Sequence, residues 1–275
     1  MFLDAELHVA YRIGNTQISN FPFPHFFIEN IFPDEFYSMI QENLPEINQM
    51  VSMADHDALI PGLASYKDRF VLDFAREDLM KKVEKDKRKF LDAFGKIFTQ
   101  GNFGNLLQAK FKRFLDMRFQ YLDNVSFKHD LKLVNDKKNY GLGPHTDKLS
   151  KVISVLFYLP KDSTHQGTGT SIYIPKDANL LDKELPHKHY PREGFHKVIT
   201  MPFVPNSAFC FIKTNNSYHG VEKLEMEDAN RWSLQYNLYI TEETLEKETI
   251  AKKKHQKENN SKNSIPKASE SKFSI

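Results

Sequence analysis

The chain has 275 residues, with 38 Lys plus Arg against 36 Asp plus Glu, and a formal charge of +2 gives no reason to expect nucleic acid or an acidic membrane as a partner. Hydrophobic residues make up 40% of it and include 23 Phe, enough for a sizeable core. The single cysteine, Cys210, excludes a disulfide framework and a cysteine-built zinc site. With neither a secretory signal nor an apolar run of roughly 20 residues, we expect a cytoplasmic protein without a membrane span.

The first part of the chain reads as one short strand followed by helices. Residues 26–28 favour a strand, and Pro33 with two acidic residues after it is typical of a helix start. Helical periodicity then covers about 78–100 and 103–121. We expect residues 1–124 to form an entry strand and buttressing helices, within the same domain as the residues that follow.

Beyond residue 121 short β-rich runs alternate with Gly, Pro, Asn and Asp. Eight strands are predicted, at 125–134, 140–147, 152–159, 168–174, 197–202, 208–214, 217–221 and 231–240. The expected fold is α+β and mainly β, with residues 125–243 as a double-stranded β-helix, or jelly roll, that forms the catalytic core. Residues 244–275 are rich in Lys, Asn, Ser and Glu and are expected to be disordered, apart from a helical turn or two at their start.

A candidate metal site follows from the spacing of three residues. His145 and Asp147 alternate at the end of a predicted strand, so their side chains point the same way. His219 comes from a distant strand and completes two imidazoles and one carboxylate. This ligand set binds iron(II) on one face and leaves positions open for a cosubstrate and dioxygen.

The last predicted strand, 231–240, alternates sharply between polar and apolar residues. Arg231 and Ser233 lie on its polar face. A planar guanidinium can bind a carboxylate through two parallel hydrogen bonds, and a serine can donate a third. A solvated edge strand would show the same alternation, so the pattern by itself leaves both interpretations open.

Together these residues resemble the iron(II)- and 2-oxoglutarate-dependent dioxygenases, specifically the prolyl-hydroxylase-like branch. His145, Asp147, His219 and Arg231 match its HxD…H…R/K pattern, and residues 21–45 (FPFPHFFIENIFPDEFYSMIQENLP) are similar to the entry strand and helix of bacterial members. The resemblance covers about residues 21–240. It implies Fe(II) held by the triad, 2-oxoglutarate anchored by Arg231 with Ser233, and ascorbate as a candidate reductant.

The same resemblance implies a reaction. Dioxygen and 2-oxoglutarate would be consumed, succinate and CO2 released, and a small-molecule or peptidyl substrate hydroxylated. Because Asp147 occupies the third ligand position on the metal, no position is left there for a halide, and hydroxylation is expected rather than halogenation. Two departures stand out. Where relatives carry a cosubstrate-binding Tyr, the nearest phenol here is Tyr140, and where they carry a Gly-Gly-acidic turn, this chain has residues 167–170 (GTGT).

Other histidines and other functions compete with this interpretation. His187 and His189 alternate as zinc ligands can, although we favour a surface loop or lid at 182–196. A catalytically silent, cupin-like ligand-binding jelly roll is one alternative function. A cupin isomerase or epimerase that works without iron is another. Neither explains Arg231 and Ser233 behind a complete triad.

Overall fold

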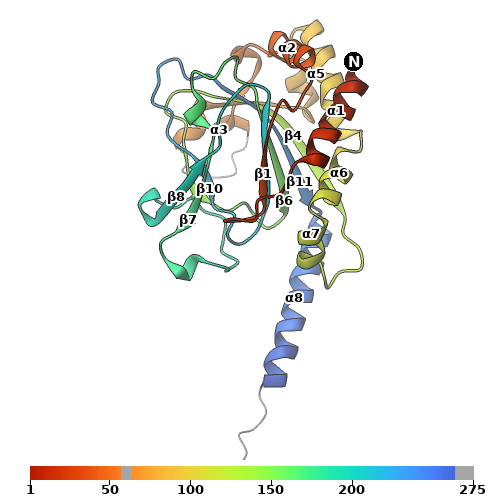
Figure 1. Cartoon of the computed structure of the whole chain (residues 1–275), viewed down its shortest axis with the longest axis vertical. Coiled ribbons are helices and arrows are strands. Elements are labelled where there is room, and N and C mark those ends of the chain that lie inside the picture. The colour runs from red at the N-terminus through yellow and green to blue at the C-terminus, as the bar shows by residue number, and fades with distance from the viewer. Residues whose placement is uncertain (57–63, 264–275) are drawn as a thin grey trace, which may run out of the picture.

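A computed structural model describes residues 1–56 and 64–263 of the chain. Within them, Figure 1 shows three layers: helices, a seven-stranded sheet and a four-stranded sheet. Across the larger sheet the strands run β1–β9–β6–β11–β4–β3–β2, and across the smaller one β5–β10–β7–β8. Every neighbouring pair in both sheets is antiparallel. The protein is therefore mainly β, as the sequence predicts.

The larger sheet consists of β1 (His25–Glu29), β9 (Ser207–Ile212), β6 (Lys151–Tyr158), β11 (Arg231–Ile240), β4 (Phe127–Asp136), β3 (Arg69–Asp73) and β2 (Val51–Ser52). The smaller sheet consists of β5 (Leu142–His145), β10 (His219–Val221), β7 (Thr170–Pro175) and β8 (Phe195–Thr200). The helices are α1 (Phe2–Asn15), α2 (Asp34–Glu42), α3 (Met53–His56), α4 (Glu77–Met80), α5 (Lys85–Thr99), α6 (Phe103–Lys110), α7 (Lys112–Arg118) and α8 (Glu242–Asn263). All eight strands predicted beyond residue 121 are present, with ends within two residues of those expected.

The first half of the chain contributes more to the sheet than the sequence suggests. β1, β2 and β3 all belong to the larger sheet, so strands from before residue 124 pair with strands from after it. β3 pairs with β4 over five positions. α1 was not predicted, and each of the two long predicted helices is broken in two, into α4 with α5 and into α6 with α7.

The helices cover one face of the larger sheet through a core rich in phenylalanine. The apolar side of β11, including Leu234 and Tyr236, belongs to this core. Phe103 packs edge-on against Tyr236 with ring centroids 4.8 Å apart, and Phe98 lies 5.0 Å from Phe157 of β6. The alternation in residues 231–240 is thus explained by burial of its apolar side under helices rather than by an edge strand, because β11 lies between β6 and β4.

The opposite face of the larger sheet faces the smaller sheet. At one end a second cluster joins the two, with Phe209 of β9 and Tyr158 of β6 packed with Ile172 of β7 and Phe203. Elsewhere this inner face is polar, which is unusual because facing sheets normally bury apolar side chains between them. The polar inner face is where the functional side chains gather.

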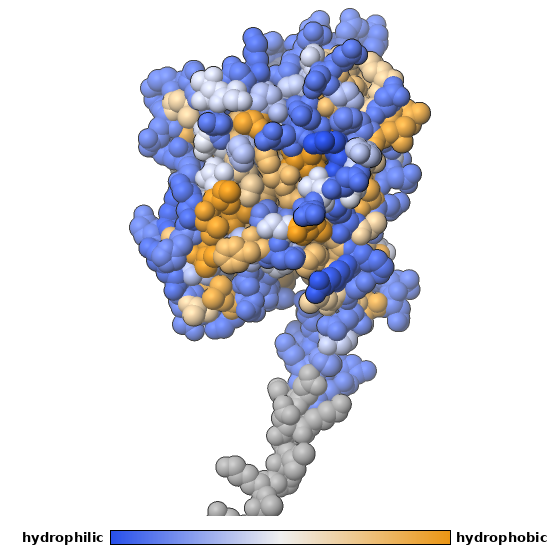
Figure 2. Space-filling view, in the orientation of Figure 1, coloured by the Kyte–Doolittle hydropathy of each residue, from blue (hydrophilic) through white to orange (hydrophobic). Residues whose placement is uncertain are grey.

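α8 extends well beyond the one or two turns that the sequence predicts. Its 22 residues consist largely of good helix formers such as Lys, Glu and Ala, so low hydrophobicity did not prevent a helix here. It projects from the body of the protein (Figure 1), and the coloured part of it that faces the viewer in Figure 2 is mostly hydrophilic. Residues 264–275 of the expected tail lie outside the described residues. Among the described helices, none has the length and apolar character needed to cross a membrane.

Candidate metal centre

The three predicted ligands converge although they lie far apart in the chain. His145 ends β5, and His219 opens β10 directly opposite it in the sheet register. Asp147 follows two residues after β5. One ligand atom from each side chain lies within 4.8 Å of the others. The imidazoles of His145 and His219 are 4.3 Å apart between centroids, and Nε2 of His219 is 3.9 Å from Oδ2 of Asp147.

Backbone carbonyls set the tautomer of both histidines. Nδ1 of His145 lies 3.0 Å from the carbonyl oxygen of Gly143, and Nδ1 of His219 lies 2.9 Å from that of Ser217. A carbonyl only accepts, so each Nδ1 carries the proton and donates it. Nε2 is then the unprotonated nitrogen, with its lone pair available to a metal.

Burial keeps both imidazoles neutral. It lowers the pKa of His145 well below 6.5, helped by the neighbouring His219, and it lowers the pKa of His219 as well. A neutral imidazole is the form that binds a metal. The pair is therefore ready to coordinate at neutral pH.

The carboxylate of Asp147 is ionised and held from both sides. Burial is the largest single effect and raises its pKa, but the charge and hydrogen bond of Lys151 together with the neighbouring His219 and His145 outweigh burial, and the net pKa lies well below the ordinary value. Nζ of Lys151 donates to Oδ1 at 3.0 Å, and the hydroxyl of Ser154 lies 3.4 Å from Oδ2. Lys151 thus leaves Oδ2, on the side of His219, as the oxygen best placed for a metal.

This donor set fits a first-row divalent metal. Two ligands bound at about 2.1 Å and at right angles to each other lie roughly 3 Å apart, so the 3.9 Å between His219 and Asp147 needs only a small closure. Two neutral imidazoles and one carboxylate form the facial triad associated with non-haem iron(II). The residues present fit iron(II), and no further protein ligand is needed.

A cavity of about 470 Å³ opens beside the triad, between the two sheets. The polar side of β11, with Arg231, Gln235 and Asn237, lines it, as do Arg69 of β3 and Lys132 of β4. Counting all lining residues, five are Lys or Arg and two are Asp. The lining is therefore net positive and suits an anionic ligand.

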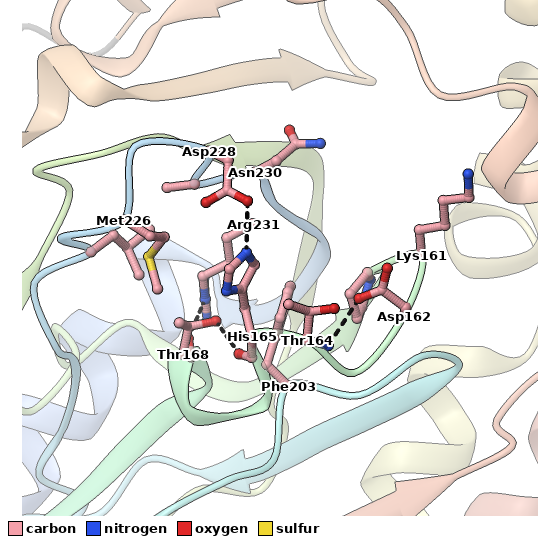
Figure 3. A pocket seen from close by; sticks show the side chains of 13 residues that line it. Lys161, Asp162, Thr164, His165, Thr168, Phe203, Met226, Asp228, Asn230 and Arg231 are labelled. Carbon is pink, nitrogen blue, oxygen red and sulfur yellow. Dashed lines mark hydrogen bonds and ion pairs between the residues drawn. The ribbon is translucent and has the colours of Figure 1, made fainter.

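Arg231 lies in this cavity and is nearly completely buried. Its Nε donates to the carbonyl oxygen of Thr168, and its Nη1 donates to Oδ2 of Asp136, both at 2.7 Å. It also lines a second cavity of about 210 Å³, where its guanidinium carbon lies 5.1 Å from the ring of Phe203 (Figure 3). The arginine is thus held rigidly in place, and it is not a surface residue.

The other two predicted cosubstrate residues lie near Arg231 but not on the cavity wall. Ser233 is buried beside the cavity and is not among its lining residues. Tyr140 packs its ring against the guanidinium of Arg69, 4.1 Å from it, and also does not line the cavity. Its buried hydroxyl has no hydrogen-bond partner among the described residues. Tyr140 thus contacts a residue of the cavity wall without lining the cavity itself.

The loop between β7 and β8 closes one side of the same cavity. His187 and His189 both line the cavity, and Nδ1 of His187 donates to the carbonyl oxygen of Thr146 at 2.8 Å. The amide of Tyr190 donates to the carbonyl oxygen of Pro144, so the loop is bonded along the strand that carries His145. Among the described residues, neither loop histidine lies within ligand distance of the triad as a group.

Three residues of the site were missed at the sequence level: Arg69, Asp136 and Lys151. Arg69 opens a five-residue strand, too short to show alternation. Asp136 ends β4 in a run of polar residues that reads as a turn. Lys151 could have been found, since it lies four residues after Asp147 at the start of a predicted strand.

No family model matches the chain, and no curated protein does either. Among solved structures it is similar to an oxidoreductase of the 2OG-Fe(II) oxygenase family from Burkholderia pseudomallei, at 11% identity and a TM-score of 0.40, over 85% of this chain and 89% of that one. It is similar to a Pseudomonas putida prolyl-4-hydroxylase, at 11% identity and a TM-score of 0.40, over 84% and 98%. It is also similar to SnoN, an alpha-ketoglutarate-dependent epimerase from nogalamycin biosynthesis, at 11% identity and a TM-score of 0.45, over 86% and 83%. These likenesses are distant, and the His-Asp-His triad is described from the residues of this chain alone.

Proposed function

We propose that the chain is an iron(II)- and 2-oxoglutarate-dependent dioxygenase with a jelly-roll core, which hydroxylates an unidentified substrate and releases succinate and CO2. One observation carries this proposal. A triad with two available Nε2 lone pairs and a carboxylate shares one cavity with a buried arginine. A ligand that chelates the metal at one end and carries a second carboxylate at the other needs the triad for its chelating end and the arginine for its second carboxylate.

Each residue then has a role. His145, Asp147 and His219 hold the iron, which when bound with 2-oxoglutarate supplies the oxidation of a C–H bond by dioxygen. Arg231 binds the distal carboxylate of the cosubstrate from the opposite end of the cavity. Lys151 neutralises the Asp147 oxygen that faces away from His219 and fixes the orientation of the carboxylate.

The surroundings exclude water and retain the substrate. The loop that carries His187 and His189 is bonded to the strand of the metal ligands and covers one side of the cavity. Loops held on a rigid scaffold commonly determine specificity. We therefore assign to this loop the contact with the substrate, a small molecule or a peptide side chain, and we treat residues 1–243 as one catalytic unit.

The first experiment is an anaerobic titration of the purified protein with iron(II) and 2-oxoglutarate. We expect one iron per chain and a visible charge-transfer band that needs both components. His145→Ala and His219→Ala should lose iron binding, whereas His196→Ala, a change at an exposed histidine on β8, should bind iron as the wild type does.

The two alternative functions give different results in the same experiment. A cupin-like binding protein would neither retain iron(II) nor release succinate under oxygen. An isomerase or epimerase working by acid–base chemistry would turn over without iron and without consuming 2-oxoglutarate. Succinate release that depends on iron(II) therefore separates the three functions. If no succinate is released from 2-oxoglutarate in the presence of iron(II) and oxygen, the proposed function is refuted.

A further inference from the structure

Arg231 does not stand alone at its end of the cavity, because three charged residues form a row across neighbouring strands. Asp136 of β4 is in register with Arg231 of β11 on one side and with Arg69 of β3 on the other. Residues in register on adjacent strands point to the same face of a sheet. We call these three residues the Arg–Asp–Arg row.

The row is tightly bonded through the central carboxylate. Nε and Nη2 of Arg69 donate to the two oxygens of Asp136 at 2.6 and 3.0 Å, and Nη1 of Arg231 donates to Oδ2 at 2.7 Å. The exposed fractions are 9% for Arg69, 0% for Asp136 and 3% for Arg231. Both guanidinium groups therefore have fixed positions before any ligand arrives.

The charge of the row is not balanced within the protein. Two guanidinium groups share one carboxylate, which leaves one positive charge in a buried place. In residues 1–56 and 64–263 no second carboxylate forms an ion pair with either arginine. An uncompensated buried charge is costly, so the row favours an anion that supplies the missing negative charge.

The two arginines line the same cavity as the metal ligands, while Asp136 does not. The carboxylate thus lies behind the arginines, and the guanidinium groups present themselves to the ligand. Tyr140 packs against Arg69 from outside the cavity and further restricts its movement. This arrangement is suited to one carboxylate that two arginines bind together.

We propose that Arg69 and Arg231 together bind the distal carboxylate of a dicarboxylic 2-oxo acid, and that Asp136 is the positioning residue that aligns them. This rests on the proposed function. It makes Arg69 a determinant of cosubstrate selectivity, equal in rank to Arg231. It also means that a 2-oxo acid without a second carboxylate leaves the positive charge of the row unmatched, and binds poorly for that reason.

The test compares 2-oxoglutarate with pyruvate, which has the same metal-chelating 2-oxo acid group but no distal carboxylate. Iron(II)-loaded protein is titrated with each under anaerobic conditions, and the ratio of the two dissociation constants is measured from the charge-transfer band. Arg69→Gln should raise the dissociation constant of 2-oxoglutarate by about tenfold to a hundredfold, because it removes a hydrogen bond between charged groups. The dissociation constant of pyruvate should be unchanged, so the ratio of the pyruvate constant to the 2-oxoglutarate constant falls by the same factor.

Further variants separate this role from a merely structural one. Arg69→Lys keeps the charge but not the two-pronged geometry and should be intermediate. Asp136→Asn should also lower the ratio, because both guanidinium groups lose their alignment. Glu248→Gln breaks a similarly buried ion pair outside the cavity, and it should keep the wild-type ratio despite lower stability.

The outcomes are distinguishable. If Arg69→Gln and Arg69→Lys both fold and keep the wild-type ratio, Arg69 only neutralises Asp136 and the inference is overturned. If Glu248→Gln lowers the ratio as much as Arg69→Gln, the effect is one of general stability, which also overturns it. If the wild type gives no band with either acid, the proposed function itself has failed.

Discussion

α8 is fastened to the body of the protein by an ion pair between Arg118 of α7 and Glu248. Nε and Nη2 of Arg118 donate to the two carboxylate oxygens, both at 3.0 Å, and the side chain of Glu248 is 4% exposed. Lys252 adds a contact of 2.9 Å but is itself 39% exposed. Arg118→Gln leaves this carboxylate with only the partly exposed Lys252 and also removes the bonds from Arg118 to the carbonyl oxygens of Leu149 and Lys151. We expect it to lower the free energy of unfolding by about 3 kcal/mol, or the Tm by roughly 6–12 °C for a chain of this size.

The assay is urea unfolding of the wild type, Arg118→Gln, Glu248→Gln and the double variant. The double variant has no stranded charge, so its loss should be clearly smaller than the sum of the two single losses. A loss below about 0.5 kcal/mol for Arg118→Gln, typical of an exposed pair, would refute the reasoning. Fully additive losses would refute it as well.

The contribution of this pair should depend on pH. Burial is the largest single effect and raises the pKa of Glu248, but the hydrogen bonds and positive charges of Arg118 and Lys252 together outweigh it, so the pKa lies below the ordinary value of 4.5. A carboxyl whose pKa is lowered by folding stabilises the protein above its unfolded pKa, and this stabilisation disappears as the pH falls through the folded pKa. The difference in stability between wild type and Glu248→Gln should thus be complete at pH 7 and shrink below about pH 4.5.

Three further predictions concern stability and accessibility. Gly169→Ala should unfold or strongly destabilise the protein, because a Cβ there would collide with the carbonyl oxygen of Met201, whereas Gly167→Ala meets nothing within 4 Å and should shift the Tm by less than about 2 °C. Cys210 is buried, and burial raises the pKa of its thiol, so iodoacetamide should label it only after denaturation, and fast labelling of the native protein would contradict the structure. A chain that ends after residue 250 should keep its Tm and its iron binding, because the buried ion pair of α8 remains. A chain that ends after residue 241 should lose as much stability as a chain that lacks that pair. Equal Tm values for the two truncated chains would count against this account.

The strands were predictable because turn-forming residues mark their ends clearly and because the alternation of polar and apolar residues is visible within each short segment. In residues 231–240 strict alternation predicts both which side chains pack together and which face a site. His145 and Asp147 were predictable as a pair for the same reason, since two residues of separation on an extended chain place them on one side. These predictions use contacts within a few residues of each other.

What could not be predicted depends on contacts between distant segments. Nothing local to Arg69 marks it as a partner of Asp136, 67 positions later; only the pairing of β3 with β4 brings them together. The attachment of the first turns of α8 to the body of the protein likewise depends on Arg118 of α7, which the composition of α8 does not reveal. The loop histidines His187 and His189 were noticed by their spacing, but their position beside the triad follows from one backbone hydrogen bond, from Tyr190 to Pro144 of β5, and from the bond of His187 to Thr146.

The Arg–Asp–Arg row has a consequence for how the strands find each other during folding. Side chains alternate between the two faces of a strand, so a slip of β4 by one residue would turn Asp136 away from both arginines and into the phenylalanine-rich core under the helices. Three buried charges would then lack partners, at a cost of several kcal/mol each, and the same slip would turn Leu131 and Leu133 of β4 out of the apolar core. The row therefore favours a single register of β3, β4 and β11. We expect the pairing of these strands to tolerate substitutions in the core but not the loss of the carboxylate at the centre of the row.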